Sequence, residues 1–277
     1  MRASTAKRPI KVVESYELRL CTFVLTFLTT LSLTKEEASY QPARVHNLME
    51  VVLPRAKHNH TIINLHGRGS NATEYKDDFH ESETSDHSVL VEVFPGIKWL
   101  YPTADIIPSR RFGSEMSQWF DMWETDEPQN RADEQARDLQ ASVTRIKQVI
   151  LDEGKEVGSE NVILCGISQG AATAITALLN MDVRVGGFIG FATWATMPVT
   201  QKLPGQAVLA TPIFLAHNRD DNVIDVKHGE ALKGRLEELG MPVTWRPYAT
   251  GGHWINEPDC IDDVVVFLES IVNPYKG

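Results

Sequence analysis

Residues 161–172 read NVILCGISQGAA and place the pattern Gly-x-Ser-x-Gly between an uninterrupted apolar run and an alanine-rich segment. Continuous apolar runs of this length are typical of strands that are covered on both faces, whereas alanine favours a helix. The stretch therefore predicts a sharp strand-to-helix turn with Ser168 at its tip. Glycine is expected at 166 and 170 because a Cβ atom at either position would collide with the neighbouring strand and helix.

Apolar runs and amphipathic segments alternate on both sides of this turn, from residue 47 to residue 272. The expected strands cover residues 47–53, 61–65, 99–101, 161–165, 188–191, 212–216 and 243–248. The expected helices cover residues 133–151, 170–179, 226–239 and 261–272, and Gly154 is expected to end the first of them. This alternation predicts a single α/β domain with a mostly parallel central sheet and helices on both faces. The long segment 71–130 is expected to carry short elements of its own.

Composition and charge narrow the possible functions. The chain has 277 residues, of which 42% are hydrophobic and 23% charged, as in ordinary globular proteins. Its 27 Lys and Arg against 37 Asp and Glu give a net charge of −10, and no basic stripe is evident, so we expect no nucleic-acid partner. The three cysteines, Cys21, Cys165 and Cys260, are too few and too widely spaced for a zinc ribbon or a disulfide framework.

The first 44 residues differ from the rest, so we expect an N-terminal extension over 1–44 and the α/β domain over 45–277. An uncharged stretch runs from Leu20 to Leu33. It is too short to span a bilayer, which takes about 20 apolar residues. It resembles a signal peptide in length, but acidic residues interrupt its approach and no clear cleavage site follows. We therefore expect a cytoplasmic protein with at most peripheral membrane association; the alternative is the secretory pathway or membrane anchoring through residues 1–35.

A serine hydroxyl becomes a nucleophile only when a base takes its proton and a third group orients that base. When the serine lies on such a turn, an acid and then a histidine follow in the chain, each after a later strand. His253 follows the strand 243–248 and two glycines, so it is the expected general base. Asp221 is the favoured acid because the apolar pair after it can pin its loop. Asp220 and Asp225 remain as alternatives.

A tetrahedral intermediate requires backbone N–H groups that stabilise its oxyanion. One is expected from Gln169, directly after the nucleophile, and the other from Arg68, in the glycine-flanked loop after the strand 61–65. Only the amide of Arg68 is needed. Its side chain is expected to face solvent, and the alternative is that it steers an anionic substrate. His66 is expected to brace this loop. No carboxylate or cysteine joins the nearby histidines into a ligand set, so no metal is expected.

Several linked motifs give the chain a specific resemblance. They are His66–Gly69 (HGRG), Trp119–Asp121 (WFD), Gly166–Gly170 (GISQG), Asp221–Ile224 (DNVI) and Gly252–His253. Together they resemble the phospholipase/carboxylesterase family, which includes acyl-protein thioesterases, over about residues 47–272. The resemblance implies an α/β-hydrolase domain that acts on acyl esters or thioesters, including S-acylated proteins, without a cofactor.

The chain also departs from the family's pattern. Arg68 stands where a smaller or apolar residue is usual, and the segment 71–130, which helps to build the acyl pocket in the family, is long and charged. Trp119 is the favoured substrate-contacting residue. The other candidates for an acyl channel are Phe112, Met116 and Trp123.

Two alternative functions remain at the sequence level. One is a carboxylesterase for short-chain or aromatic esters that has no protein substrate. The other is a non-catalytic receptor that keeps the α/β-hydrolase fold for binding a small molecule. The sequence leaves the acyl-chain length and the oligomeric state open.

Overall fold

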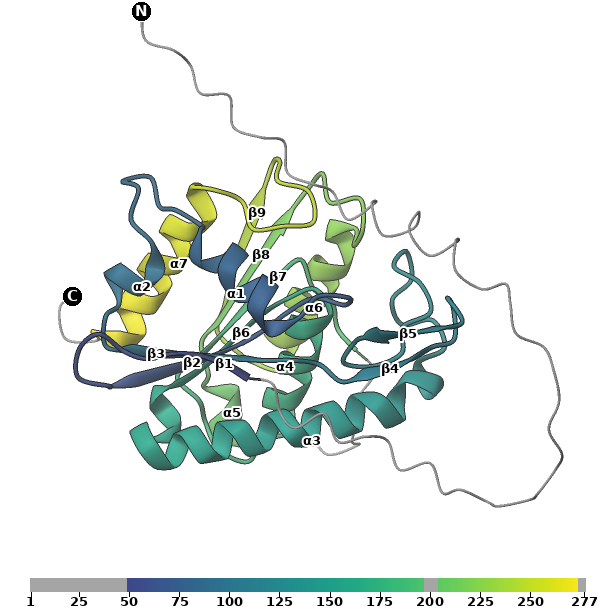
Figure 1. The fold of residues 1–277 in the computed structure, drawn as a ribbon, viewed down its shortest axis with the longest axis horizontal. Helices are drawn as coiled ribbons and strands as arrows, with labels where there is room; N and C mark the ends of the chain where they lie inside the picture. Colours follow the sequence, from purple (N-terminus) through teal and green to yellow (C-terminus); the bar gives the residue numbers. More distant parts are fainter. Residues whose placement is uncertain (1–48, 197–203, 274–277) are drawn as a thin grey trace, which may run out of the picture. The chain divides into compact units, whose positions relative to one another are not determined.

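The computed structural model describes residues 49–196 and 204–273, which form a central sheet with helices on both sides (Figure 1). Within these residues the sheet has seven strands in the order β1-β3-β2-β6-β7-β8-β9. Their bounds are β1 Met49–Val52, β2 His60–Leu65, β3 Ile97–Pro102, β6 Val162–Ile167, β7 Gly187–Phe191, β8 Ile213–Asn218 and β9 Val243–Tyr248. Strand β1 pairs antiparallel with β3, and the other pairings of this described sheet are parallel. The predicted mostly parallel sheet is confirmed.

The helices divide between the two faces of the sheet. Their bounds are α1 Ala72–His80, α2 Leu90–Val93, α3 Ala132–Val157, α4 Gln169–Leu179, α5 Gln206–Leu209, α6 Val226–Glu238 and α7 Asp259–Val272, with a 3₁₀ turn at Ser159–Asn161. Buried side chains of α3, α4, α5 and α6 pack into one hydrophobic core, and those of α1, α2 and α7 pack into another. In the ribbon, α3 and α5 lie on one side of the sheet and α1, α2 and α7 on the other (Figure 1). Helices on both faces are therefore confirmed.

The position of strand β6, which leads to Ser168, explains why its sequence is continuously apolar. Each of its residues is buried. Because successive side chains of a strand point to opposite faces, Val162 and Leu164 enter one core, whereas Ile163 and Cys165 enter the other. Both faces are covered, so both must be apolar.

The end of α3 corrects one expectation. The helix does not end at Gly154 but runs on to Val157. Gly154 keeps a helical backbone, and a Cβ there would lie 3.4 Å from Cα of Ser159, so this glycine serves close packing against the next segment. The backbone leaves the helix at Gly158, where φ is +88°, a conformation that glycine adopts at little cost.

The segment 71–130 carries short elements, as predicted. It contains α1, α2, β3 and a two-stranded hairpin of β4 Ile106–Ser109 and β5 Ser114–Ser117. The predicted extension, residues 1–44, lies outside the described residues and stays a prediction. Among the helices that the structure describes, none is both long and apolar enough to cross a membrane.

Candidate active site

The turn between β6 and α4 holds Ser168 in a strained backbone conformation. Ser168 has φ +55° and ψ −126°, values that non-glycine residues adopt only when their surroundings enforce them. Two neighbours enforce them here. The Ser168 amide donates to the carbonyl of Phe191 at 2.9 Å, and its carbonyl accepts from the Thr193 hydroxyl at 3.0 Å. The turn is thereby fixed against the end of β7.

Close packing explains the two glycines of this turn. A Cβ on Gly170 would lie 2.3 Å from the carbonyl oxygen of His66 and 2.4 Å from that of Leu65, at the end of β2. A Cβ on Gly166 would lie 2.9 Å from the amide nitrogen of Ala171 in α4. The expected collisions with strand and helix are therefore confirmed.

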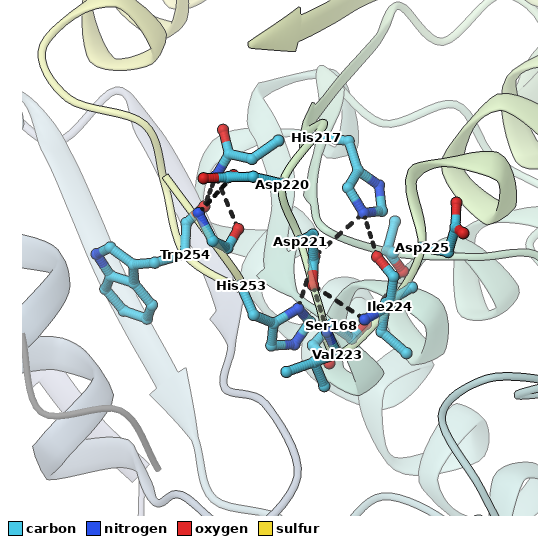
Figure 2. A network of polar contacts seen from close by, with 12 residues as sticks. Ser168, His217, Asp220, Asp221, Val223, Ile224, Asp225, His253 and Trp254 are labelled. Carbon is cyan, nitrogen blue, oxygen red and sulfur yellow. Dashed lines mark hydrogen bonds and ion pairs between the residues drawn. The ribbon is translucent and has the colours of Figure 1, made fainter. Parts of the chain in front are cut away.

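A hydrogen bond between a carboxylate and an imidazole connects the loops that follow β8 and β9 (Figure 2). Nδ1 of His253 lies 2.8 Å from Oδ2 of Asp221. Because the carboxylate accepts, Nδ1 carries the proton, and Nε2 is left with a lone pair that forms no hydrogen bond with a described residue. The His253 side chain is 21% exposed, whereas that of Asp221 is fully buried. The imidazole thus offers a free basic nitrogen near the surface.

Several donors surround the carboxylate of Asp221. The amides of Val223 and Ile224 both donate to Oδ1 at 2.9 Å. Burial raises the pKa of this carboxyl, but hydrogen bonds from His217 and His253 outweigh burial and bring the pKa well below its usual range. Asp221 is therefore ionised at neutral pH and holds the imidazole in one orientation.

A second imidazole, that of His217, contacts the same carboxylate. Nε2 of His217 lies 2.8 Å from the carbonyl oxygen of Ile224 and 3.2 Å from Oδ2 of Asp221 (Figure 2). Since both neighbours are acceptors, Nε2 carries the proton. Nδ1 is buried without a partner among the described residues, next to Gly229. Sequence reasoning did not assign this residue a role, although its place at the end of β8 and four residues before the acid was a usable signal.

The alternative acids have other partners. Asp220 accepts from the amides of Gly252 at 2.9 Å and Gly251 at 3.2 Å, both in the loop that carries the base. Asp225 caps α6 by accepting from the amide of Lys227 at 2.9 Å. Of the three carboxylates, Asp221 is the one in hydrogen-bond contact with the imidazole of His253.

Asn218 complements Asp220 in fastening the base loop. Its Nδ2 donates to the carbonyls of Gly252 at 2.9 Å and Trp254 at 2.7 Å, on either side of His253. We call Asn218 and Asp220 the loop clasp. Sequence reasoning missed Asn218, and the sequence offers no local pattern that would have revealed this role.

The loop after β2 lies against Ser168. A Cβ on Gly67 would lie 3.6 Å from Cβ of Ser168, so the residues after Gly67 border the same site. The backbone amides of Arg68 and Gln169 donate to no residue in the described part of the chain. Two amides without acceptors among the described residues, on either side of Ser168, are the kind of donors that can stabilise an oxyanion.

His66 braces this loop as expected. Its Nδ1 donates to the carbonyl of Gly67 at 2.7 Å, and its Nε2 accepts from the amide of Ala104 at 2.9 Å. This pattern needs the neutral ring. Burial accordingly lowers the pKa of His66 to about 4.

The family model described as Phospholipase/Carboxylesterase matches residues 46–271. The chain belongs to the phospholipase/carboxylesterase family. The similarity predicted from its motifs is therefore confirmed, and the matched range includes each candidate site residue.

Curated members of the family span nearly the same length. Acyl-protein thioesterase 1 of Gibberella zeae is 26% identical over 81% of this chain and 96% of its own length. Carboxylesterase SOBER1 of Arabidopsis thaliana is 29% identical over 72% of this chain and 85% of its own length. The crystal structure of Zea mays acyl-protein thioesterase 2 covers 82% of this chain and 100% of its own, with 24% identity and a TM-score of 0.68. The predicted α/β-hydrolase fold is confirmed.

Arg68, where this chain departs from the family's usual residue, corrects an expectation. Its side chain is half-buried and folds back onto the protein. Nη1 donates to the carbonyl of Met122 at 3.0 Å, and Cζ lies 5.6 Å from the ring centroid of Phe112. The long side chain reaches a carbonyl acceptor and an aromatic face, and both hold it against the protein.

Trp119 supports the loop after β2 from the core. It is 1% exposed, and its Nε1 donates to the carbonyl of His66 at 2.8 Å. The side chain of Gln169 accepts from the Trp119 amide at 2.9 Å and donates to the Phe120 carbonyl at 2.8 Å. Gln169 thus ties the nucleophile turn to the WFD segment. The expected contact between Trp119 and substrate stays a prediction.

Proposed function

We propose that this chain hydrolyses carboxylic esters or acyl thioesters, with Ser168 as nucleophile, His253 as general base and Asp221 as the acid that orients it. One observation carries the proposal. The His253–Asp221 contact of 2.8 Å leaves Nε2 unpaired in the described structure, and both loops follow strands of the sheet that also bears the strained Ser168 turn. Because the chain belongs to the phospholipase/carboxylesterase family, its enzyme class is carboxylic ester hydrolase.

The first half of the reaction acylates the enzyme. Nε2 of His253 takes the proton of the Ser168 hydroxyl as Oγ attacks the carbonyl carbon of the substrate. The carbonyl oxygen becomes an oxyanion that accepts from the amides of Arg68 and Gln169. The protonated imidazole then gives its proton to the departing alkoxide or thiolate, and an acyl-serine ester remains.

The second half releases the acid. Water enters the site, His253 takes one of its protons, and the hydroxide attacks the acyl-serine carbonyl. The second tetrahedral intermediate collapses when the imidazolium returns the proton to Ser168 Oγ. Asp221 stays ionised throughout because its four hydrogen-bond donors stabilise the charge.

The substrates that we propose are acyl esters and thioesters, with S-acylated proteins as the protein substrate. Relatives named acyl-protein thioesterase 1 support this choice. A carboxylesterase without a protein substrate is the second candidate, favoured by the relative named carboxylesterase SOBER1.

We propose a cytoplasmic location. Sequencing of the mature N-terminus by mass spectrometry tests it, since removal of the first residues would indicate the secretory route.

Active-site labelling tests the enzyme against a non-catalytic receptor. A fluorophosphonate probe is expected to label the wild type and to fail with Ser168→Ala. Ser114→Ala, which alters an exposed serine of β5, serves as the matched control and should label fully. Turnover of 4-nitrophenyl esters by Ser168→Ala at the wild-type rate would refute the mechanism. A series of acyl lengths, together with palmitoyl-CoA, then separates the two substrate classes.

A further inference from the structure

Two guanidinium groups converge beside the oxyanion loop. Nη1 of Arg68 donates to the carbonyl of Met122 at 3.0 Å, and Nη1 of Arg111 donates to the next carbonyl, that of Trp123, at 3.0 Å. Both groups also approach one aromatic ring. Their Cζ atoms lie 5.6 and 5.3 Å from the ring centroid of Phe112. Consecutive carbonyls and a shared ring thus fix two positive charges in one place.

Neither of these arginines has a carboxylate counterion among the described residues. The adjacent Arg110 differs, because it pairs with Glu134 at 2.7 Å and lies 3.7 Å from Asp121. Apart from their bonds to the two carbonyls, the N–H groups of Arg68 and Arg111 donate to no described residue. They are available to an acceptor that the protein does not supply.

The pairing of like charges is unfavourable in the free protein. Burial lowers the pKa of the Arg68 guanidinium, the charge of Arg111 lowers it further, and Asp121 offsets only part of this effect. An anion between the two guanidiniums would replace repulsion by attraction and would accept charge-assisted hydrogen bonds. In a chain with a net charge of −10, a local pair of uncompensated arginines also favours anions at this place over others.

The pair borders the reaction centre through the backbone. The amide of Arg68 is one of the two proposed oxyanion donors, and Gly67 lies against Ser168. The amide of Gly69 donates to the carbonyl of Ser117 at 2.7 Å and thereby ties this loop to the hairpin that carries Arg111. The two arginines are thus held by the loop that also carries one of the proposed oxyanion donors and by the hairpin tied to it.

We propose that Arg68 and Arg111 form an anion subsite that binds a carboxylate or phosphate of the substrate. The subsite deepens the proposed function and rests on it. It makes esters or thioesters with an anionic group the preferred substrates. The charge belongs either to the acyl chain or to the leaving group, and the experiment distinguishes these sources.

Matched ester pairs test the subsite. For a charge on the acyl chain, the mono-4-nitrophenyl ester of adipate is compared with neutral 4-nitrophenyl hexanoate. For a charge on the leaving group, 4-carboxyphenyl butyrate is compared with its neutral 4-carbamoylphenyl analogue. The wild type is expected to prefer the anionic member of one pair in kcat/KM. Arg111→Gln should lower that preference about tenfold, the effect of losing one charge-assisted hydrogen bond. Arg68→Gln keeps the backbone amide and should lower it similarly.

Arg110→Gln is the matched control, since this neighbouring arginine is already paired, and it should leave the ratio within each pair unchanged. The preference should also weaken as salt is raised. Suppose that the neutral esters are hydrolysed, but that the ratio of kcat/KM within each pair is the same in wild type, Arg111→Gln and Arg110→Gln. This result would overturn the subsite while leaving the proposed function intact.

A binding measurement keeps the test independent of turnover. Phenyl phosphate titrated into Ser168→Ala protein should bind, and adding Arg111→Gln should raise Kd about tenfold. Equal Kd values, or no binding to either protein, would refute the subsite even if neither ester series were hydrolysed. Failure of hydrolysis alone would refute the proposed function instead.

Discussion

At the residue scale, the hydrogen bonds of the three neighbouring carboxylates separate their roles. Asp221→Asn should lower kcat by about 10⁴-fold, because an amide favours the wrong tautomer of His253. Asp220→Asn should cost about tenfold, since it weakens only the loop clasp. Steady-state kinetics of both variants, with circular dichroism to check folding, measures the difference. A larger loss for Asp220→Asn would move the acid role to that residue.

His217 provides a second prediction at this scale. Its Nε2–H withdraws charge from the carboxylate that stabilises the imidazolium of His253. Removing the donor in His217→Phe should lower kcat/KM about tenfold, because the buried carboxylate then loses one of the hydrogen bonds that hold it in place against His253. His217→Gln restores an N–H donor and should recover part of the rate. Equal losses of rate in the two variants would indicate a purely structural role.

The sequence predicted Ser168, Asp221 and His253 because each follows a recognisable strand and lies in a short local pattern. It did not reveal the loop clasp or the contact of His217, since these bonds join loops whose relative positions depend on the whole sheet. The same limit explains the wrong expectation for the Arg68 side chain. Its acceptor, the Met122 carbonyl, is 54 residues away along the chain.

At the element scale, the close approach of α4 to the end of β2 depends on Gly170. A methyl group there would meet backbone oxygens at 2.3 and 2.4 Å, and backbone cannot move aside as a side chain can. Gly170→Ala should therefore lower the free energy of unfolding by about 3 kcal/mol. Urea unfolding followed by circular dichroism measures it.

Gly234→Ala is the control for that measurement. Gly234 lies inside α6, and nothing lies within 4 Å of a Cβ built on it. Alanine there should stabilise the protein by about 1 kcal/mol, because it favours the helix without a clash. If both substitutions had the same sign, packing at the turn would not be the reason for glycine at 170.

Element prediction succeeded where one periodicity dominated and failed where a single residue was overinterpreted. Residues 162–165 of the predicted strand lie in β6, and the stripe of 133–151 lies in α3, as expected. Gly154 did not end α3, because a glycine ends a helix only where the chain needs a backbone conformation that other residues avoid. Which glycine meets that need depends on the path of the following segment.

At the scale of the whole molecule, acid should destabilise the fold through His66. Its folded-state pKa of about 4 lies below the ordinary value of about 6.5, so its stabilising effect is complete above that value and is lost as the pH falls toward 4. This imidazole alone should lower the free energy of unfolding by roughly 2 kcal/mol between pH 7.5 and pH 5. Urea unfolding at a series of pH values measures the slope.

His66→Asn is the variant that tests the source of this slope. Asparagine keeps a donor and an acceptor but does not titrate, so the variant should be less stable at neutral pH and less sensitive to acid. An unchanged slope would assign the acid sensitivity to other groups.

The loop clasp has a consequence for anyone who recombines this protein with its relatives. Asn218 and Asp220 form hydrogen bonds with residues on either side of His253, so the segments that carry Asp221 and His253 have to be exchanged together. A hybrid that exchanges only residues 249–254 would import an imidazole without its anchors. Crossover points therefore belong before β8 or beyond Trp254, where a swap carries both halves of the pair together.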